Sequence, residues 1–122
     1  MAKTVLIVED DADLRALYAL WFEKMGLQLI LASNGFEGAE MALRQPVDFI
    51  VLDVMMPDAT GIEVLSLLSQ NPTTKEIPVL VVSNLDRDQI RFEGYEDQVM
   101  DVLLKANFTP RKVAEMVSKY LS

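Results

Sequence analysis

Five short apolar runs, none of which alternates with polar residues, dominate the sequence. They occupy residues 5–8, 29–32, 49–52, 79–82 and 102–104. Strands of a parallel sheet have this pattern, because helices cover both faces of such a sheet and leave neither face to solvent. The runs therefore predict a parallel sheet of five short strands.

Amphipathic helical patterns separate the runs. Apolar or small residues recur at i, i+3, i+4 and i+7 from Leu14, from Gly61 and from Val113, which gives each helix one apolar stripe. The spacing of helix caps is found in Asn34 with Glu37, Thr60 with Glu63, Asp86 with Gln89, and Thr109 before Pro110. Residues 86–100 predict only a short, poorly amphipathic fourth helix, because this segment contains Gly94 and several charged residues.

The alternation of strands and helices favours an α/β fold. Right-handed crossovers between parallel strands put helices on both faces of the sheet, which gives a doubly wound (βα)5 sandwich. The 122 residues, 51% of them hydrophobic, suffice for one core and not for two. Residues 1–122 are therefore predicted to form one domain, with its ligand site at the carboxyl ends of the strands.

The charge balance and the missing residue types exclude several classes of function. With 11 basic and 19 acidic residues the net charge is −8, which disfavours direct binding to nucleic acid or to an anionic membrane. Cysteine and histidine are absent, which excludes disulfides, thiolate or imidazole metal sites and a Ser-His-Asp triad. A bound metal would need oxygen ligands, as Mg²⁺, Mn²⁺ and Ca²⁺ do. No apolar stretch is long enough for a signal peptide or a membrane span, so we expect a cytoplasmic protein.

Polar residues follow four of the predicted strands. Glu9, Asp10 and Asp11 follow the first, Asp53 the third, Ser83 the fourth and Lys105 the fifth. The carboxyl ends of parallel strands lie at one edge of the sheet, so these side chains are expected to meet there. Clustered carboxylates repel one another and need a cation, and Mg²⁺ is suited to them because it keeps positions open for a phosphate.

This constellation predicts phosphoryl chemistry. A metal-neutralised Asp53 carboxylate can attack phosphorus, while Lys105 and Ser83 supply a cation and a donor for the phosphoryl oxygens. Taken singly, each residue has a simpler interpretation, such as a helix cap for Asp11, a turn for Asp53 or Ser83 and a surface charge for Lys105. Their coincidence at four strand ends favours a shared site.

These residues resemble the receiver domains of two-component response regulators over essentially the whole chain. The resemblance is carried by residues 5–11, by residues 53–58 with the following Gly61, and by the spacings of thirty positions from Asp53 to Ser83 and twenty-two from Ser83 to Lys105. It implies a flavodoxin-like sheet of order 2-1-3-4-5. It also implies a phosphoryl group on Asp53, donated by a sensor histidine kinase or a histidine phosphotransfer protein and read by a downstream effector protein.

The same resemblance implies the role of each site residue. Asp10, Asp53 and the backbone carbonyl of Met55 would bind Mg²⁺ directly, with Glu9 acting partly through water. Lys105 would hold one phosphoryl oxygen, and Ser83 would turn inward to hold another. The protein would be a switch with at most slow self-phosphorylation and self-dephosphorylation, present as a monomer or a weak homodimer.

Four positions depart from the family's usual pattern or bear on the lifetime of the phosphate. Val102 replaces the usual aromatic residue three positions before the lysine, and Ala106 replaces the proline after it. The bond between Lys105 and Ala106 is therefore expected to be a strained cis bond, or trans with Lys105 re-aimed. Met55 and Leu85 cannot orient a hydrolytic water by strong hydrogen bonds, so a long-lived aspartyl phosphate is predicted.

Three alternatives stay open at the level of the sequence. A degenerate receiver would bind partners constitutively, which the replacements at Val102 and Ala106 favour. An aspartate-nucleophile phosphatase would need an acidic residue where Met55 stands. A flavodoxin-like cofactor carrier would need a glycine- or serine-rich loop after the first strand, where this chain is acidic.

Overall fold

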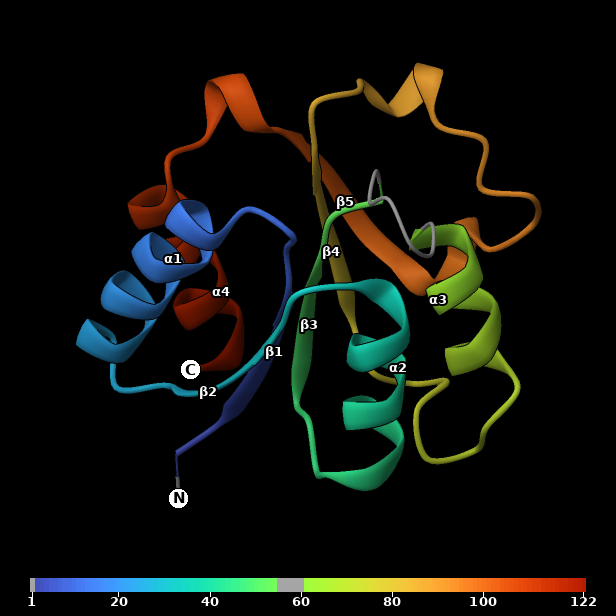
Figure 1. Ribbon diagram of the computed structural model, residues 1–122, viewed down its shortest axis with the longest axis horizontal. Helices are drawn as coiled ribbons and strands as arrows, with labels where there is room; N and C mark the ends of the chain where they lie inside the picture. The colour runs from blue at the N-terminus through green and yellow to red at the C-terminus, as the bar shows by residue number, and fades with distance from the viewer. Residues whose placement is uncertain (1, 55–60) are drawn as a thin grey trace.

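The computed structural model describes residues 2–54 and 61–122 (Figure 1). Its centre is one five-stranded parallel sheet in the order β2-β1-β3-β4-β5. The strands are β1 (Thr4–Val8), β2 (Gln28–Ala32), β3 (Phe49–Leu52), β4 (Val79–Ser83) and β5 (Val99–Leu104). The predicted α/β fold class and the strand order 2-1-3-4-5 are thus confirmed.

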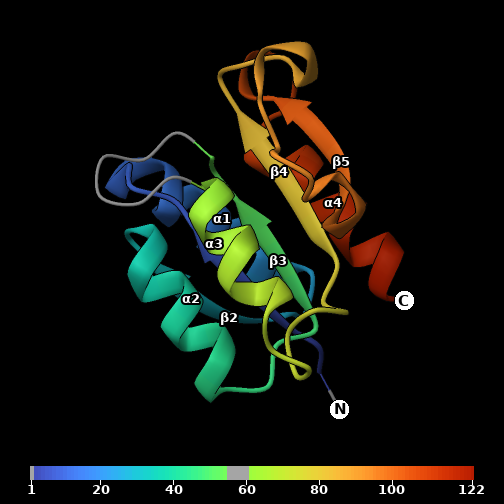
Figure 2. The ribbon, with the colours of Figure 1, turned by 90° about the vertical axis from the view of Figure 1, so that its right-hand side faces the viewer.

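Helices cover both faces of the sheet, as Figures 1 and 2 show. The helices are α1 (Ala12–Lys24), α2 (Gly35–Arg44), α3 (Gly61–Ser69) and α4 (Pro110–Leu121). Successive residues of a strand point to opposite faces, so Phe49 and Val51 pack in the cluster under α1 and α4. Ile50 and Leu52 pack in the cluster under α2 and α3. This double burial explains why the strands read as unbroken apolar runs.

Side-chain caps start three helices where the sequence predicts them. The Asp11 carboxylate accepts hydrogen bonds from the N–H groups of Asp13 and Leu14 at 2.9 and 3.2 Å. Asn34 accepts from the Glu37 N–H at 2.9 Å, and Thr109 accepts from the Lys112 N–H at 3.2 Å. Thr60, the predicted partner of Glu63, lies outside the described residues.

The predicted fourth helix within residues 86–100 is wrong. The segment forms two 3₁₀ turns, η1 (Arg87–Gln89) and η2 (Glu96–Gln98), and β5 begins at Val99. Gln89 still fills its predicted cap role, because its Oε1 accepts a hydrogen bond from the Asp86 N–H at 2.9 Å. Glu93 and Gly94 have φ angles of 53° and 94°, in the left-handed region that an α-helix cannot contain.

Two glycines let α2 approach β1 and let the start of α3 approach the segment after β3. A Cβ atom on Gly61 would lie 2.5 Å from the Val54 Cα, and one on Gly38 would lie 2.6 Å from a methyl group of Val8. Overpacking of this kind costs about 1–3 kcal/mol. We expect Gly61→Ala to lower the free energy of unfolding in urea by more than Gly38→Ala, because backbone yields less easily than a side chain. Equal stability of Gly61→Ala and the wild type would contradict this packing.

A candidate magnesium and phosphoryl site

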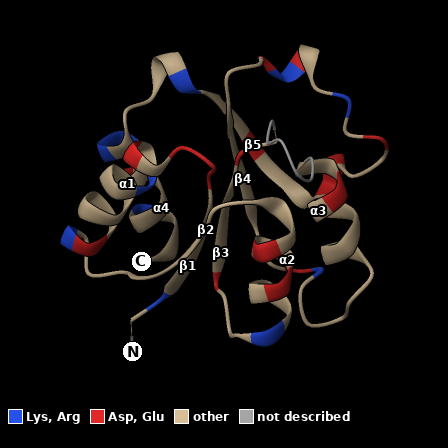
Figure 3. Ribbon diagram, in the orientation of Figure 1, with Lys and Arg blue, Asp and Glu red and all other residues tan. Residues whose placement is uncertain are grey.

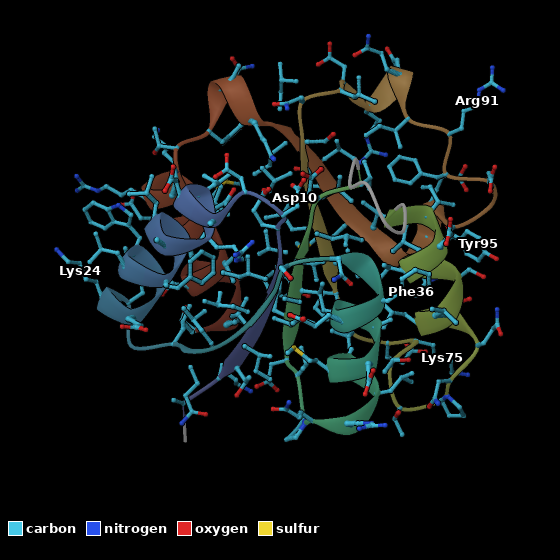
Figure 4. All side chains as sticks on the ribbon, in the orientation of Figure 1. Asp10, Lys24, Phe36, Lys75, Arg91 and Tyr95 are labelled. Atoms are coloured by element: carbon cyan, nitrogen blue, oxygen red, sulfur yellow. The ribbon has the colours of Figure 1, made fainter. Side chains whose placement is uncertain are left out.

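The carboxyl ends of the strands bring the predicted site residues to one edge of the sheet. β1 and β3 are neighbours with Val8 opposite Leu52, so Glu9 and Asp53 leave adjacent strands at the same level. The Asp53 N–H donates to the Val8 carbonyl at 3.1 Å, which ties the two strand ends together. Figure 4 shows Asp10 at this edge. In Figure 3 the acidic segment that follows β1 is red.

Glu9, Asp10 and Asp53 form an acidic cluster. One carboxylate oxygen of each lies within 4.8 Å of the others. Glu9 and Asp53 are only 2% and 5% exposed, whereas Asp10 is exposed. Buried carboxylates repel one another unless a cation lies among them. Three hard oxygen donors at this separation, one of them open to solvent, fit Mg²⁺ and its retained waters.

Lys105 is the cation of this cluster in the structure. Its Nζ lies 2.8 Å from Glu9 Oε1 and 2.9 Å from Asp53 Oδ2. Burial acts to lower the pKa of Lys105, but the hydrogen bonds and charges of Glu9 and Asp53 outweigh it and raise that pKa to about 12. Lys105 therefore stays charged at physiological pH and holds the two buried carboxylates together.

The Lys105–Ala106 bond answers one question that the sequence left open. No peptide bond is cis in the described parts of the chain, which include residues 105 and 106. Lys105 still contacts Asp53, so the loss of the usual proline does not turn the ammonium group away from the cluster. Val102 is half-buried and packs against the core under α2 and α3.

Ser83 lies at the end of the strand next to β3, but its hydroxyl contacts the turn that follows β4. Its side chain is fully buried at the end of β4, and its Oγ accepts a hydrogen bond from the Leu85 N–H at 3.2 Å. The hydroxyl accepts in this bond, so its own proton can still be donated to another group. Met55, whose carbonyl was predicted to bind the metal, lies outside the described residues.

Arg15 is a site residue that the sequence analysis missed. Its guanidinium donates to the backbone carbonyl of Glu9 at 2.7 Å, from the second turn of α1. The Asp11 N–H also donates to Glu9 Oε2 at 3.1 Å, so the turn that presents the acids is held from two sides. Nothing in the sequence marks Arg15, because an arginine in a helix is usually a solvated surface charge.

Comparison with known proteins agrees with this geometry. The family model of the response regulator receiver domain matches residues 5–118. The chain belongs to this family. As a receiver domain, it is 31% identical over 121 residues to the transcriptional regulatory protein SrrA of Staphylococcus aureus. That alignment covers 99% of this chain and 48% of SrrA, so the chain spans about half the length of this curated relative.

Solved structures show the same receiver fold. The chemotaxis protein CheY4 of Vibrio cholerae superposes with a TM-score of 0.86 at 24% identity, over 98% of each chain. The receiver domain of the sensor histidine kinase PA1611 of Pseudomonas aeruginosa superposes with a TM-score of 0.84 at 18% identity, over 99% of this chain and 98% of that one. The PA1611 structure holds a magnesium ion in its active site cleft. Within the described residues of the present receiver domain, no helix is long and apolar enough to cross a membrane.

Burial of Glu9 makes the stability of the receiver domain depend on pH. Burial raises the pKa of Glu9 above its usual 4.5, although its hydrogen bond with Lys105 acts in the opposite direction. An acid with a raised folded-state pKa holds its proton more tightly when folded, so its contribution to stability falls as pH rises from 4.5 through the folded value. We expect Glu9→Gln to be modestly more stable than the wild type in metal-free urea melts at pH 7, with the difference vanishing below about pH 4.

Asp10→Asn is the matched control, because it removes a carboxylate of the same cluster at an exposed position. A Glu9→Gln protein that is less stable than the wild type at pH 7 would show that the pairing with Lys105 outweighs the burial of Glu9.

Proposed function

We propose that this receiver domain accepts one phosphoryl group on the Asp53 carboxylate, with the help of Mg²⁺, and uses it as a conformational signal. The observation that carries the proposal is the Lys105 ammonium group, 2.9 Å from Asp53 and 2.8 Å from Glu9 inside a cluster of three carboxylates. A lone buried aspartate would be a poor nucleophile and a poor ligand. Here Lys105 supplies a counter-charge next to the Asp53 carboxylate and a cation for the phosphate.

Mg²⁺ is the metal that we assign to the acidic cluster. Asp10 and Asp53 would bind it directly, together with the carbonyl of Met55, and Glu9 would act partly through water. When bound, the ion neutralises the carboxylates and draws charge from the phosphoryl oxygens. The exposure of Asp10 beside the two buried acids leaves a path for the ion and its waters.

Asp53, Lys105 and Ser83 have separate roles in the proposed phosphoryl transfer. An Asp53 oxygen attacks phosphorus and forms the new P–O bond, while the P–N bond to a donor phosphohistidine breaks and its electron pair stays on the imidazole. The Lys105 ammonium group donates a hydrogen bond to a phosphoryl oxygen and balances the negative charge that builds on that oxygen. The Ser83 hydroxyl turns inward and donates a hydrogen bond to another phosphoryl oxygen, and its link to the Leu85 N–H couples this movement to the turn after β4.

The partners and the location follow from this assignment. A sensor histidine kinase or a histidine phosphotransfer protein is the proposed donor, and a downstream effector protein is the proposed reader. Receiver domains interact with histidine kinases and effector domains, and the proposed activity is a cytoplasmic one. The domain would be a switch with only slow self-phosphorylation and self-dephosphorylation, and it would act as a monomer or a weak homodimer.

Val102 favours a second candidate, a receiver that binds its partner without phosphorylation. A small aliphatic side chain replaces the aromatic residue that usually turns inward when the hydroxyl residue moves. The complete set of Glu9, Asp10, Asp53 and Lys105 around one point weighs against it, because a constitutive binding module has no use for buried acids that need a cation.

Incubation with acetyl phosphate separates the two candidates. With Mg²⁺ present, intact-mass analysis should show one added phosphoryl group per chain, and with EDTA it should show none. A protein that gains no mass in Mg²⁺, although it is folded by circular dichroism, would leave the constitutive module as the better account.

The lifetime of the phosphate is a further expected result. Leu85, two positions after Ser83, is apolar, and so is Met55, two positions after Asp53. Neither side chain can orient an attacking water by strong hydrogen bonds, so the aspartyl phosphate should decay slowly. Met55→Asn should shorten its half-life several-fold when decay is followed by intact mass. An unchanged half-life would contradict this role for Met55.

A further inference from the structure

An open groove lies between α3 and the segment that joins β4 to β5. It has a volume of about 570 Å³, within the range of about 300–1,000 Å³ that ligand pockets take. Val54, Ile62, Leu85, Ile90 and Tyr95 supply its apolar lining. Figure 4 shows Tyr95 beside α3, on the same side of the molecule as Arg91.

The groove is open because residues 86–98 form 3₁₀ turns in place of a packed helix. The Tyr95 hydroxyl donates to Ser66 Oγ at 3.0 Å, and the Gln98 amide donates to the Leu65 carbonyl at 3.0 Å. These bonds fix the end of the segment to α3. Phe92, just before the left-handed turn at Glu93 and Gly94, is buried in the core cluster that contains the α3 side chains, whereas Ile90 is only partly buried against it. The partly buried Ile62, Leu85 and Ile90 therefore line the groove.

Negative charge surrounds this apolar lining. Residues 84–98 contain five carboxylates and two arginines, and one of these, Arg87, lies 3.9 Å from Asp101. Glu63 and Glu93 line the groove itself, with Arg91 as the one opposing charge among its lining residues in the described chain. Charge of one sign around an apolar surface selects a partner of the opposite sign and speeds its encounter.

We propose that this groove is a docking site for a partner protein's amphipathic segment, whose apolar side chains are flanked by lysine or arginine. An apolar anchor would pack between Ile62 and Ile90, as amphipathic helices do in hydrophobic grooves. The flanking cations would face Glu63 and Glu93. The net charge of −8 disfavours nucleic acid as the occupant.

The position of the groove also ties it to the candidate phosphoryl site. Val54 follows Asp53 directly, and the Leu85 N–H is bound to the Ser83 hydroxyl. The docking proposal goes beyond the proposed function and does not depend on it, because it is tested on the unphosphorylated protein.

A pair of designed peptides tests the docking site. One is a short amphipathic peptide with leucines at helical spacing between lysines, and its partner carries glutamate in place of every lysine. In NMR titrations the lysine peptide should shift the signals of Ile62, Leu85, Ile90 and Tyr95. Added salt should weaken the binding of this peptide. The glutamate peptide should leave these signals unmoved.

Two exposed groups on the rim give opposite expectations. Glu93→Asn removes a carboxylate and suits the left-handed backbone, so the lysine peptide should bind about threefold more weakly. Arg91→Glu should tighten it by a similar factor, and Glu23→Asn, on the exposed part of α1, should change nothing.

Three results would overturn the proposal. The lysine peptide could shift signals on another face, such as that of the exposed Leu17 and Leu20 on α1. Both peptides could bind equally. Sedimentation could show that the protein dimerises with no peptide added, and the NMR signals of the groove could shift with protein concentration.

Discussion

Asp53→Asn is expected to abolish the phosphoryl mass gain, with a rate lower than that of the wild type by roughly 10³-fold or more. The amide keeps the size of the side chain and can still accept a hydrogen bond from Lys105, but it has no anionic oxygen to attack phosphorus. The measurement is intact mass after incubation with acetyl phosphate and Mg²⁺, with circular dichroism to show that the fold is retained.

Asp10→Asn is the matched control for Asp53→Asn. It removes one carboxylate from the same cluster but leaves the nucleophile, so the protein should still gain a phosphoryl group and should need more Mg²⁺ to do so. Full mass gain in Asp53→Asn would mean that another side chain is the acceptor. Complete loss in Asp10→Asn at saturating Mg²⁺ would mean that Asp10 does more than bind the ion.

Lys105→Met is expected to change three quantities at once. Phosphoryl transfer should slow by about 10²–10³-fold, because a preorganised cation no longer meets the charge that develops on the phosphoryl oxygens. The free energy of unfolding in metal-free urea should fall by about 3–5 kcal/mol, because Glu9 and Asp53 stay buried without their shared partner. Mg²⁺ should bind more tightly, since the ammonium group no longer competes for the same carboxylates.

The combination distinguishes a site residue from a merely structural one. Lys112→Met, on the exposed first turn of α4, is the matched control and should change none of the three quantities. Mg²⁺ should restore much of the lost stability in Lys105→Met, because the ion replaces the missing positive charge. Weaker Mg²⁺ binding in Lys105→Met would contradict the competition between the lysine and the metal.

The sheet and the acidic edge could be predicted from the sequence because both rest on strong local signals. Unbroken apolar runs such as residues 49–52 are typical of strands covered on both faces, and the residue after each strand falls at the same edge. Asp11, Asn34 and Thr109 cap their helices as expected, since a cap needs only the residues next to it.

The remaining features depend on tertiary contacts. The segment between β4 and β5 carries a cap signal at Asp86 and Gln89, and that bond forms, but the left-handed Glu93 and Gly94 divide the segment into two separate turns. The contact of Arg15 with the Glu9 carbonyl needs the packing of α1 against the sheet, which spacing alone does not reveal. For the same reason the groove beside α3 could not be foreseen.

A crystal structure of the protein with Mg²⁺ and beryllofluoride tests the central claim most directly. The account predicts the beryllium group on an Asp53 oxygen and the ion between Asp10 and Asp53, with Lys105 and Ser83 turned to the fluorine atoms. An ion bound away from Asp10 and Asp53, or an Asp53 left unmodified while Lys105 keeps its contacts with both buried carboxylates, would contradict it.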